Sequence, residues 1–186
     1  MQHYFEDKVY EYLKNKTIVI VGFMGSGKTF LATNLSMILS MKYIDTDILI
    51  EEREKMSIAE IFKEKGEKYF RIVEKTILQD VVYSISAKEN LIIATGGGLP
   101  IRVANQKLLK LLNPLVICLN PPFDEIMNRI KGTKRPLVYR RSRKYIFNLW
   151  VNRYEVYQKI SDINLSEINI IEILESLNKR VLLKIM

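Results

Sequence analysis

Short apolar stretches rich in β-branched residues alternate along the chain with longer amphipathic stretches. The short stretches predict four strands, at residues 17–21, 42–46, 91–95 and 115–119, and a weaker fifth strand near 162–165. Three of the four are nearly continuous apolar runs, which is typical of a parallel sheet covered on both faces. The amphipathic stretches predict helices at residues 27–40, 67–86, 101–112, 122–131, 145–160 and 167–184. This alternation indicates right-handed βαβ units and a doubly wound α/β fold.

The length of 186 residues indicates one domain, which we expect to cover residues 17–186. Residues 1–16 are expected to form a helical extension, because their apolar residues recur at helical spacing. Ser57 and Glu60 form a possible capping box ahead of a further short helix. A hydrophobic fraction of 48% and a charged fraction of 27% exclude a disordered chain.

The cysteine count and the hydropathy pattern restrict the possible location of the protein. The single cysteine, Cys118, cannot form an intramolecular disulfide or a cysteine zinc site. No apolar run reaches the roughly 18 residues that a membrane helix needs, and the polar N-terminus does not look like a signal peptide. We therefore expect a cytoplasmic protein.

The net charge of +8 comes almost entirely from one stretch, residues 131–144, which carries seven basic residues and no acidic one. Such a cluster suits a phosphate-rich small ligand as well as a polynucleotide. Gly132 gives this stretch local freedom, Pro136 gives it a rigid corner, and helices flank it. It is therefore either a solvated loop or a mobile lid, at about 131–145, that carries Arg135 toward phosphates.

The strongest motif is GFMGSGKT at residues 22–29, which matches G-x-x-x-x-G-K-[ST] at every fixed position. A predicted strand precedes it and a predicted helix follows it, as this phosphate-binding loop (P-loop) requires. Its glycines let backbone N–H groups face a phosphate, and the helix N-terminus adds positive potential. We expect Lys28 to reach the β- and γ-phosphates and the Thr29 hydroxyl to bind Mg²⁺.

Two carboxylates, Asp45 and Asp47, follow the second predicted strand. Residues two apart point to the same side of an extended chain, and we expect this strand to lie next to the P-loop strand. One carboxylate could then hold Mg²⁺ through water while the other accepts a proton from a hydroxyl. The alternative is that Asp47 only caps a helix that begins at the next residue.

Further candidate residues follow the third predicted strand or lie on two of the predicted helices. Gly96, Gly97 and Gly98 allow a ligand to approach the backbone closely, unless they form a simple turn. Arg71 is three residues before Glu74, so the two form either a solvated ion pair or a clamp for a substrate carboxylate. Arg153 is either a second carboxylate ligand or a surface charge.

Together these motifs resemble the shikimate kinase family over residues 17–183. The resemblance rests on GFMGSGKT (22–29), YIDTDILIEE (43–52), SIAEIFKEKGEKYFRIVE (57–74), ATGGG (94–98), KGTKRPL (131–137) and RYEVYQKISD (153–162). It implies a P-loop NTPase fold of the nucleoside monophosphate kinase type, with a five-stranded parallel sheet flanked by helices and a mobile lid. It also implies transfer of the γ-phosphoryl group of ATP to the 3-hydroxyl of shikimate, on the route to aromatic amino acids. Mg²⁺ would be the cofactor, and the enzyme a monomer that binds neither nucleic acid nor membrane.

The resemblance assigns a role to each matching residue. The implied catalytic residues are Lys28, Asp47 and Arg135, and the implied metal ligands are Thr29 and Asp45. Binding of ATP is implied for Gly22, Met24, Gly25, Ser26, Gly27, Lys28, Thr29, Phe30, Arg129 and Arg135. Binding of shikimate is implied for Asp47, Arg71, Gly96, Gly97, Gly98 and Arg153, with Glu74 orienting the site.

Three alternatives remain open from the residues alone. Another kinase of the same fold, for gluconate or a nucleoside monophosphate, would carry the same P-loop, and gluconate also has a carboxylate. A nucleic-acid-binding P-loop protein would explain the basic charge and would bind in a salt-sensitive way. A nucleotide-binding module without activity is disfavoured because Lys28, Thr29, Asp45 and Asp47 are all present.

Overall fold

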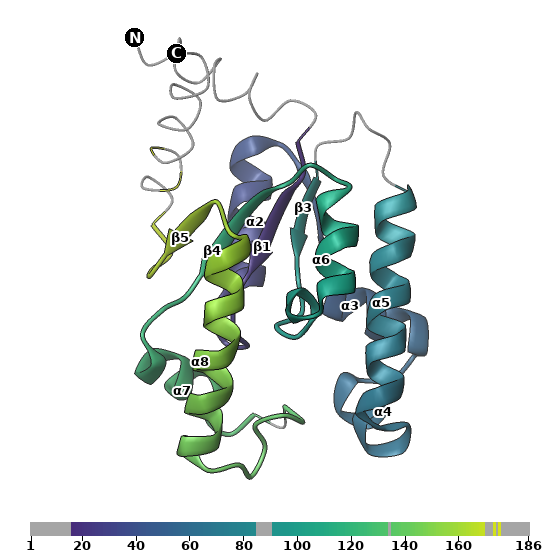
Figure 1. The fold of residues 1–186 in the computed structure, drawn as a ribbon, viewed down its shortest axis with the longest axis vertical. Helices are drawn as coiled ribbons and strands as arrows, with labels where there is room; N and C mark the ends of the chain where they lie inside the picture. The colour runs from purple at the N-terminus through teal and green to yellow at the C-terminus, as the bar shows by residue number, and fades with distance from the viewer. Residues whose placement is uncertain (1–15, 85–90, 134, 170–172, 174, 176–186) are drawn as a thin grey trace, which may run out of the picture.

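A computed structural model describes residues 16–84, 91–133, 135–169, 173 and 175. Its strands are β1 (Ile18–Val21), β2 (Lys42–Asp45), β3 (Leu91–Ala94), β4 (Leu115–Leu119) and β5 (Ile163–Leu165). Every strand pairing is parallel, and the five strands form one sheet in the order β2-β3-β1-β4-β5 (Figure 1). The predicted five-stranded parallel sheet is therefore confirmed. The extension expected at residues 1–16 and the helix expected at 167–184 fall almost wholly outside the described residues.

The strand order corrects one expectation. β3 pairs with both β1 and β2, so β2 is an edge strand and does not lie next to the P-loop strand. β3 is apolar at all four positions and buried on both faces, whereas β2 exposes its first two residues. The more apolar strand occupies the interior of the sheet, because only there are both of its faces covered.

The helices lie close to the predicted stretches. They are α2 (Lys28–Leu39), α3 (Thr46–Glu54), α4 (Ile58–Glu64), α5 (Gly66–Ser84), the 3₁₀ turn η1 (Leu99–Ile101), α6 (Val103–Lys110), α7 (Phe123–Ile130) and α8 (Arg143–Ile160). The predicted capping box at α4 is confirmed, with both of its hydrogen bonds present. None of the helices in the described ranges combines the length and the apolar character needed to cross a membrane.

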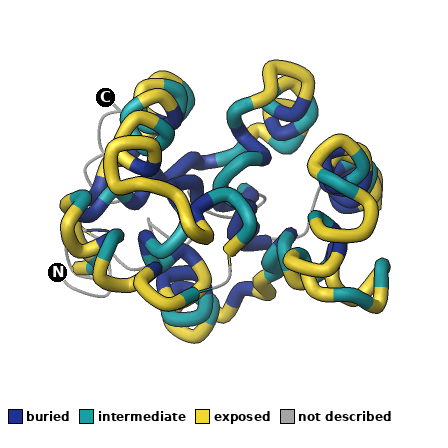
Figure 2. Tube along the Cα trace, turned by 90° about the horizontal axis from the view of Figure 1, so that it is seen from below, coloured by how far each residue is buried: buried dark blue, intermediate teal, exposed yellow. Residues whose placement is uncertain are grey.

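Two hydrophobic clusters cover the two faces of the sheet. Successive residues of β1 contribute alternately to them: Val19 packs with residues of α5, α7 and α8, while Ile18 and Ile20 pack with Leu31 and Leu35 of α2. Figure 2 shows the buried positions along the strands and on the inner sides of the helices, with exposed positions outside. This rigid double-sided core fixes the strand ends from which the loops of the site emerge.

Two groups of elements flank the carboxyl ends of the strands. The helices α3, α4 and α5 pack together on one side, while α7, α8 and the connection between them lie on the other (Figure 1). That connection contains the basic stretch predicted as a lid, and it has no helix or strand among its described residues. α8 begins within this stretch, two residues earlier than expected, with Ser142 as its N-cap.

Candidate active site

The loop between β1 and α2 has the conformation that its sequence predicts. Gly25 and Gly27 have φ angles of 79° and 103°, a region that glycine adopts far more readily than other residues. The backbone N–H of Ser26 donates to the Phe23 carbonyl at 3.1 Å, which closes the turn, and α2 begins at Lys28. The helix N-terminus and the curled loop together form a concavity suited to phosphate oxygens.

Lys28 is buried at the base of this concavity. Its Nζ donates to the carbonyl of Phe23, 2.9 Å away. Burial lowers the pKa of Lys28 from 10.5 to about 8, although Asp47 and Asp45 pull it in the opposite direction. A lysine held this way is desolvated in advance, so an arriving phosphate meets a largely unscreened positive charge.

Asp45 connects the P-loop with the edge of the sheet. Its Oδ2 accepts a hydrogen bond of 2.7 Å from the Thr29 hydroxyl, and its Oδ1 accepts one of 2.9 Å from the backbone N–H of Asp47. Asp45, and not Asp47, is therefore the residue that caps α3. The predicted extended geometry was wrong, because α3 begins at Thr46 and places Asp47 in its first turn. The two carboxylates nevertheless face the same cavity.

Asp47 is in a strongly perturbed environment. Burial and the nearby charge of Asp45 raise its pKa from 3.8 to about 6, while Lys28 and Arg135 oppose that rise. A carboxylate with a pKa near 6 is mostly ionised at pH 7 and still basic enough to accept a proton.

The three glycines after β3 make room for side chains of the site. A Cβ atom at Gly96 would collide with Asp47 Oδ1, and one at Gly98 would collide with the guanidinium of Arg71. A Cβ at Gly97 would lie 3.6 Å from Arg153 Nη1. The absence of side chains at Gly96 and Gly98 therefore leaves room for Asp47 and Arg71, whatever contact these glycines also make with a ligand.

Arg71 is a buried member of an ion-pair network and not a surface charge. Its Nη1 donates to both carboxylate oxygens of Glu74, at 2.9 and 3.1 Å. Its Nε and Nη2 both donate to Oε1 of Glu67, at 3.2 and 3.0 Å. Burial lowers the pKa of Arg71, but the two glutamates outweigh it and raise that pKa overall. The solvated surface pair considered from the sequence is therefore excluded.

Arg153 is also buried and approaches the same cavity from α8. Its guanidinium lies over the ring of Phe23, 5.6 Å from the centroid. Its Nη1 is a buried nitrogen that has no hydrogen-bond partner among the described residues. One turn later on α8, the hydroxyl of Tyr157 donates to the carbonyl of Gly97 and ties the helix to the glycine loop. An arginine with an unused buried donor is an expected feature of an anion site.

The predicted ATP contacts are only partly assembled. Arg129 donates from Nη1 to the carbonyls of Ser26 and Gly25, at 3.0 and 3.4 Å, so it lies against the P-loop. Arg135 is exposed but lines the cavity together with Arg129. Phe30 does not line the cavity, and 63% of its surface is exposed. Gly22 and Ser26 shape the loop from behind and do not line the cavity.

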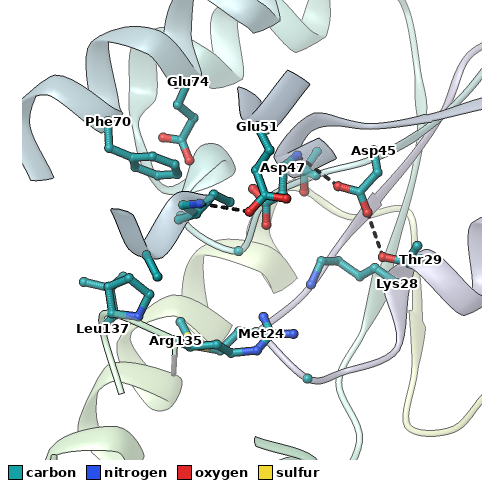
Figure 3. A pocket seen from close by; sticks show the side chains of 18 of the residues that line it. Met24, Lys28, Thr29, Asp45, Asp47, Glu51, Phe70, Glu74, Arg135 and Leu137 are labelled. Atoms are coloured by element: carbon teal, nitrogen blue, oxygen red, sulfur yellow. Dashed lines mark hydrogen bonds between the residues drawn. The ribbon is translucent and has the colours of Figure 1, made fainter. Parts of the chain in front are cut away.

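Lys28, Asp45, Asp47, Arg71, Glu74, Arg153 and the three glycines line one cavity of about 700 Å³. Figure 3 shows Lys28 beside the Asp45–Thr29 hydrogen bond, with Phe70 and Glu74 on one side of the cavity and Arg135 on another. Sequence reasoning missed several wall residues: Ile48, Glu51, Ile58, Phe62, Phe70 and Leu137. Glu51 could have been found, because it lies one helical turn after Asp47. It accepts a 2.9 Å hydrogen bond from the backbone N–H of Ile58.

Comparison with known proteins gives one consistent family. A family model described as shikimate kinase matches residues 24–179. The shikimate kinase of Dictyoglomus turgidum is 36% identical over 151 residues, which span 79% of this chain and 85% of that protein. The shikimate kinase of a Sulfurihydrogenibium species is 40% identical over 144 residues, which span 77% of this chain and 83% of that protein. A solved structure of Acinetobacter baumannii shikimate kinase in complex with shikimate superposes with a TM-score of 0.74 at 27% identity, covering 91% of this chain and 92% of that one.

Proposed function

The chain belongs to the shikimate kinase family, and from that premise we propose how its residues carry out the ATP-dependent phosphorylation of shikimate. The observation that carries the proposal is that the P-loop lysine, Lys28, and two buried arginines, Arg71 and Arg153, line one cavity. Such a cavity can hold a polyphosphate at one end and a carboxylate at the other. Asp47 lines the same cavity and can contact a hydroxyl of the substrate.

The nucleotide end uses the P-loop. Its backbone N–H groups and Lys28 hold the β- and γ-phosphates. Thr29 and Asp45 fit Mg²⁺, because their oxygens are already 2.7 Å apart and Mg²⁺ typically takes few protein ligands besides phosphate and water. When bound, Mg²⁺ supplies charge neutralisation at the phosphate oxygens.

The substrate end uses the two arginines. Arg71 and Arg153 receive the carboxylate of shikimate, and the unused Nη1 of Arg153 is one donor for it. Gly96, Gly97 and Gly98 let the sugar-like ring approach the backbone. Glu74, which is fully buried, keeps the Arg71 guanidinium in place through its two hydrogen bonds.

The chemical step is an in-line displacement at the γ-phosphorus. The 3-hydroxyl oxygen of shikimate forms the new bond to phosphorus, the bond to the bridging oxygen of ADP breaks, and the hydroxyl proton passes to Asp47. Lys28 and Arg135 stabilise the charge on the transferred group. Because little covalent help is needed, alignment of the two substrates provides most of the catalysis.

The segment around Arg135 acts as the lid. Its closure brings Arg135 to the phosphates and removes water that would otherwise hydrolyse ATP. The proposal also includes that the protein is a cytoplasmic monomer and binds no nucleic acid. The basic stretch at residues 131–144 then acts on the phosphates of ATP. The gluconate alternative has less support, since the family model and the curated relatives named above are those of shikimate kinases.

The proposal is tested by substituting Arg71 with lysine, which keeps the charge and removes the planar fork. Arg71→Lys should weaken shikimate binding about tenfold to a hundredfold and leave ATP binding nearly unchanged. Shikimate and ATP are titrated separately into the purified variant, and ADP release is then followed with shikimate, gluconate and nucleoside monophosphates. Arg53→Lys is the matched control, because Arg53 is an exposed arginine paired with Asp80 outside the cavity.

Unchanged shikimate affinity in Arg71→Lys would show that Arg71 is not a carboxylate ligand. Parallel loss of ATP affinity would place its role in the fold or at the phosphates. Faster ADP release with gluconate than with shikimate would overturn the substrate assignment itself.

A further inference from the structure

Arg71 and Arg153 are held at the cavity by different means. Arg71 donates hydrogen bonds to Glu67 and Glu74, which restrain its guanidinium from two sides. Arg153 forms no ion pair with a carboxylate of the described residues, and its buried Nη1 has no hydrogen-bond partner among them. The contact of Arg153 with the ring of Phe23 adds attraction but no hydrogen bond. The position of the Arg153 guanidinium therefore depends largely on how α8 is held.

Tyr157 holds α8 one turn after Arg153. Its side chain is fully buried, and its hydroxyl donates to the carbonyl of Gly97, 60 residues away in the chain. Burial raises the pKa of this hydroxyl, and the charge of Arg153 lowers that pKa by less, so the hydroxyl stays protonated and remains a donor. α8 also packs on η1, which directly follows the three glycines. The hydroxyl is thus a polar link between the helix of Arg153 and the loop after β3.

Arg153 and Tyr157 meet the same glycine. Residues four apart lie on one face of a helix, and both Arg153 and Gly97 line the cavity. A Cβ atom at Gly97 would lie 3.6 Å from Nη1 of Arg153, so the unpaired donor lies beside the backbone whose carbonyl Tyr157 holds. Because a hydrogen bond constrains both distance and angle, this bond fixes the glycine loop relative to α8. Without it, the loop and the helix could shift relative to each other at the substrate end.

We propose that Tyr157 is a positioning residue for shikimate, which aims the unpaired Nη1 of Arg153 at the substrate carboxylate by holding the carbonyl of Gly97. This inference rests on the proposed role of Arg153 as a carboxylate ligand. Tyr157 is not among the residues that line the cavity, so it acts through Arg153 and not by contact with a substrate. Since the P-loop holds ATP without its help, Tyr157 sets the affinity for shikimate and not the affinity for ATP.

The first test is Tyr157→Phe, which removes the hydroxyl and keeps the ring in the core. The variant should bind shikimate about threefold to tenfold more weakly, as expected for the loss of one hydrogen bond. Its KM for shikimate should rise more than its kcat falls, and its ATP affinity should stay the same. Tyr154→Phe is the matched control, because it removes a hydroxyl of the same helix that accepts a hydrogen bond from Gln158 outside the cavity. It should leave both affinities unchanged.

The second test is a double-mutant cycle that asks whether Tyr157 acts through Arg153. Arg153→Ala alone should weaken shikimate binding. Adding Tyr157→Phe to it should cause no further loss, because the donor that Tyr157 aims is already gone. Urea unfolding of each variant establishes that the protein is folded under the conditions of the binding measurements.

Unchanged shikimate affinity in Tyr157→Phe, together with easier unfolding in urea, would make the hydroxyl a structural contact only. Equal loss of shikimate and ATP affinity would also overturn the proposal, because the whole site would then be disturbed. The same holds for a full additional loss in the double variant. Arg153→Ala separates these failures from failure of the proposed function. If it weakens shikimate binding while Tyr157→Phe does not, only the role of Tyr157 is wrong; if it binds shikimate normally, the carboxylate assignment of Arg153 fails and the role of Tyr157 fails with it.

Discussion

Replacing Asp47 with asparagine should make the protein more stable and nearly inactive. Asp47 is charged at pH 7 in a place where its charge is unfavourable, because burial and Asp45 raise its pKa from 3.8 to about 6. This shift already includes the attraction of Lys28, so it measures the net effect of the charge. An asparagine side chain at this position would keep the size of the aspartate and remove that charge.

The size of the effect follows from proton linkage. Between pH 4 and pH 6 the folded state holds the Asp47 proton more tightly than the unfolded chain does, so the free energy of unfolding falls as the pH rises through this window. The loss is complete above the folded pKa and amounts to about 3 kcal/mol at pH 7 and about 1.6 kcal/mol at pH 5. Asp47→Asn should therefore raise the free energy of unfolding by most of about 3 kcal/mol at pH 7, and by about half as much at pH 5.

Urea unfolding at the two pH values measures the difference, and ADP release measures activity. The wild type should also lose turnover below about pH 6, as Asp47 becomes protonated, whereas the variant should have low turnover throughout. Asp80→Asn, at an exposed aspartate paired with Arg53, should change stability by less than about 1 kcal/mol. A variant at position 47 that is no more stable than the wild type at pH 7, or whose advantage does not grow with pH, would refute the reasoning.

Two other substitutions test the nucleotide end. Lys28→Met should reduce turnover on the order of a hundredfold or more, because the charge that faces the β- and γ-phosphates is lost, while the circular dichroism spectrum stays native; near-normal turnover would contradict the P-loop assignment. Asp45→Asn should raise the Mg²⁺ concentration needed for half-maximal activity and leave the fold intact, because asparagine caps α3 as well as aspartate does. A titration of Mg²⁺ against ADP release measures this, and unchanged metal dependence would exclude Asp45 from the metal site.

Features that depend on local backbone chemistry were predictable from the sequence. The P-loop is one, because its glycines, the lysine and the following helix lie within eight residues and need no distant partner. Three of the strands were predictable for a similar reason, since short, unbroken apolar runs rich in β-branched residues are typical of strands inside a covered sheet. The capping box at Ser57 and Glu60 is equally local, and both of its hydrogen bonds form.

Features that depend on which segments meet were decided by the tertiary structure. The sequence does not say that β3 lies between β1 and β2, because strand order follows from how the faces of all five strands are covered together. It leaves open whether Arg71 and Glu74 form a surface pair or a carboxylate clamp, and their burial is seen only in the fold, where α5 packs beside the loop of Gly98. Arg153 becomes part of the same cavity only because α8 packs on the same face of the sheet as α5. Glu67 shows the same limit: its four-residue spacing from Arg71 is visible in the sequence, but its ion pair with a buried arginine exists only in the folded chain.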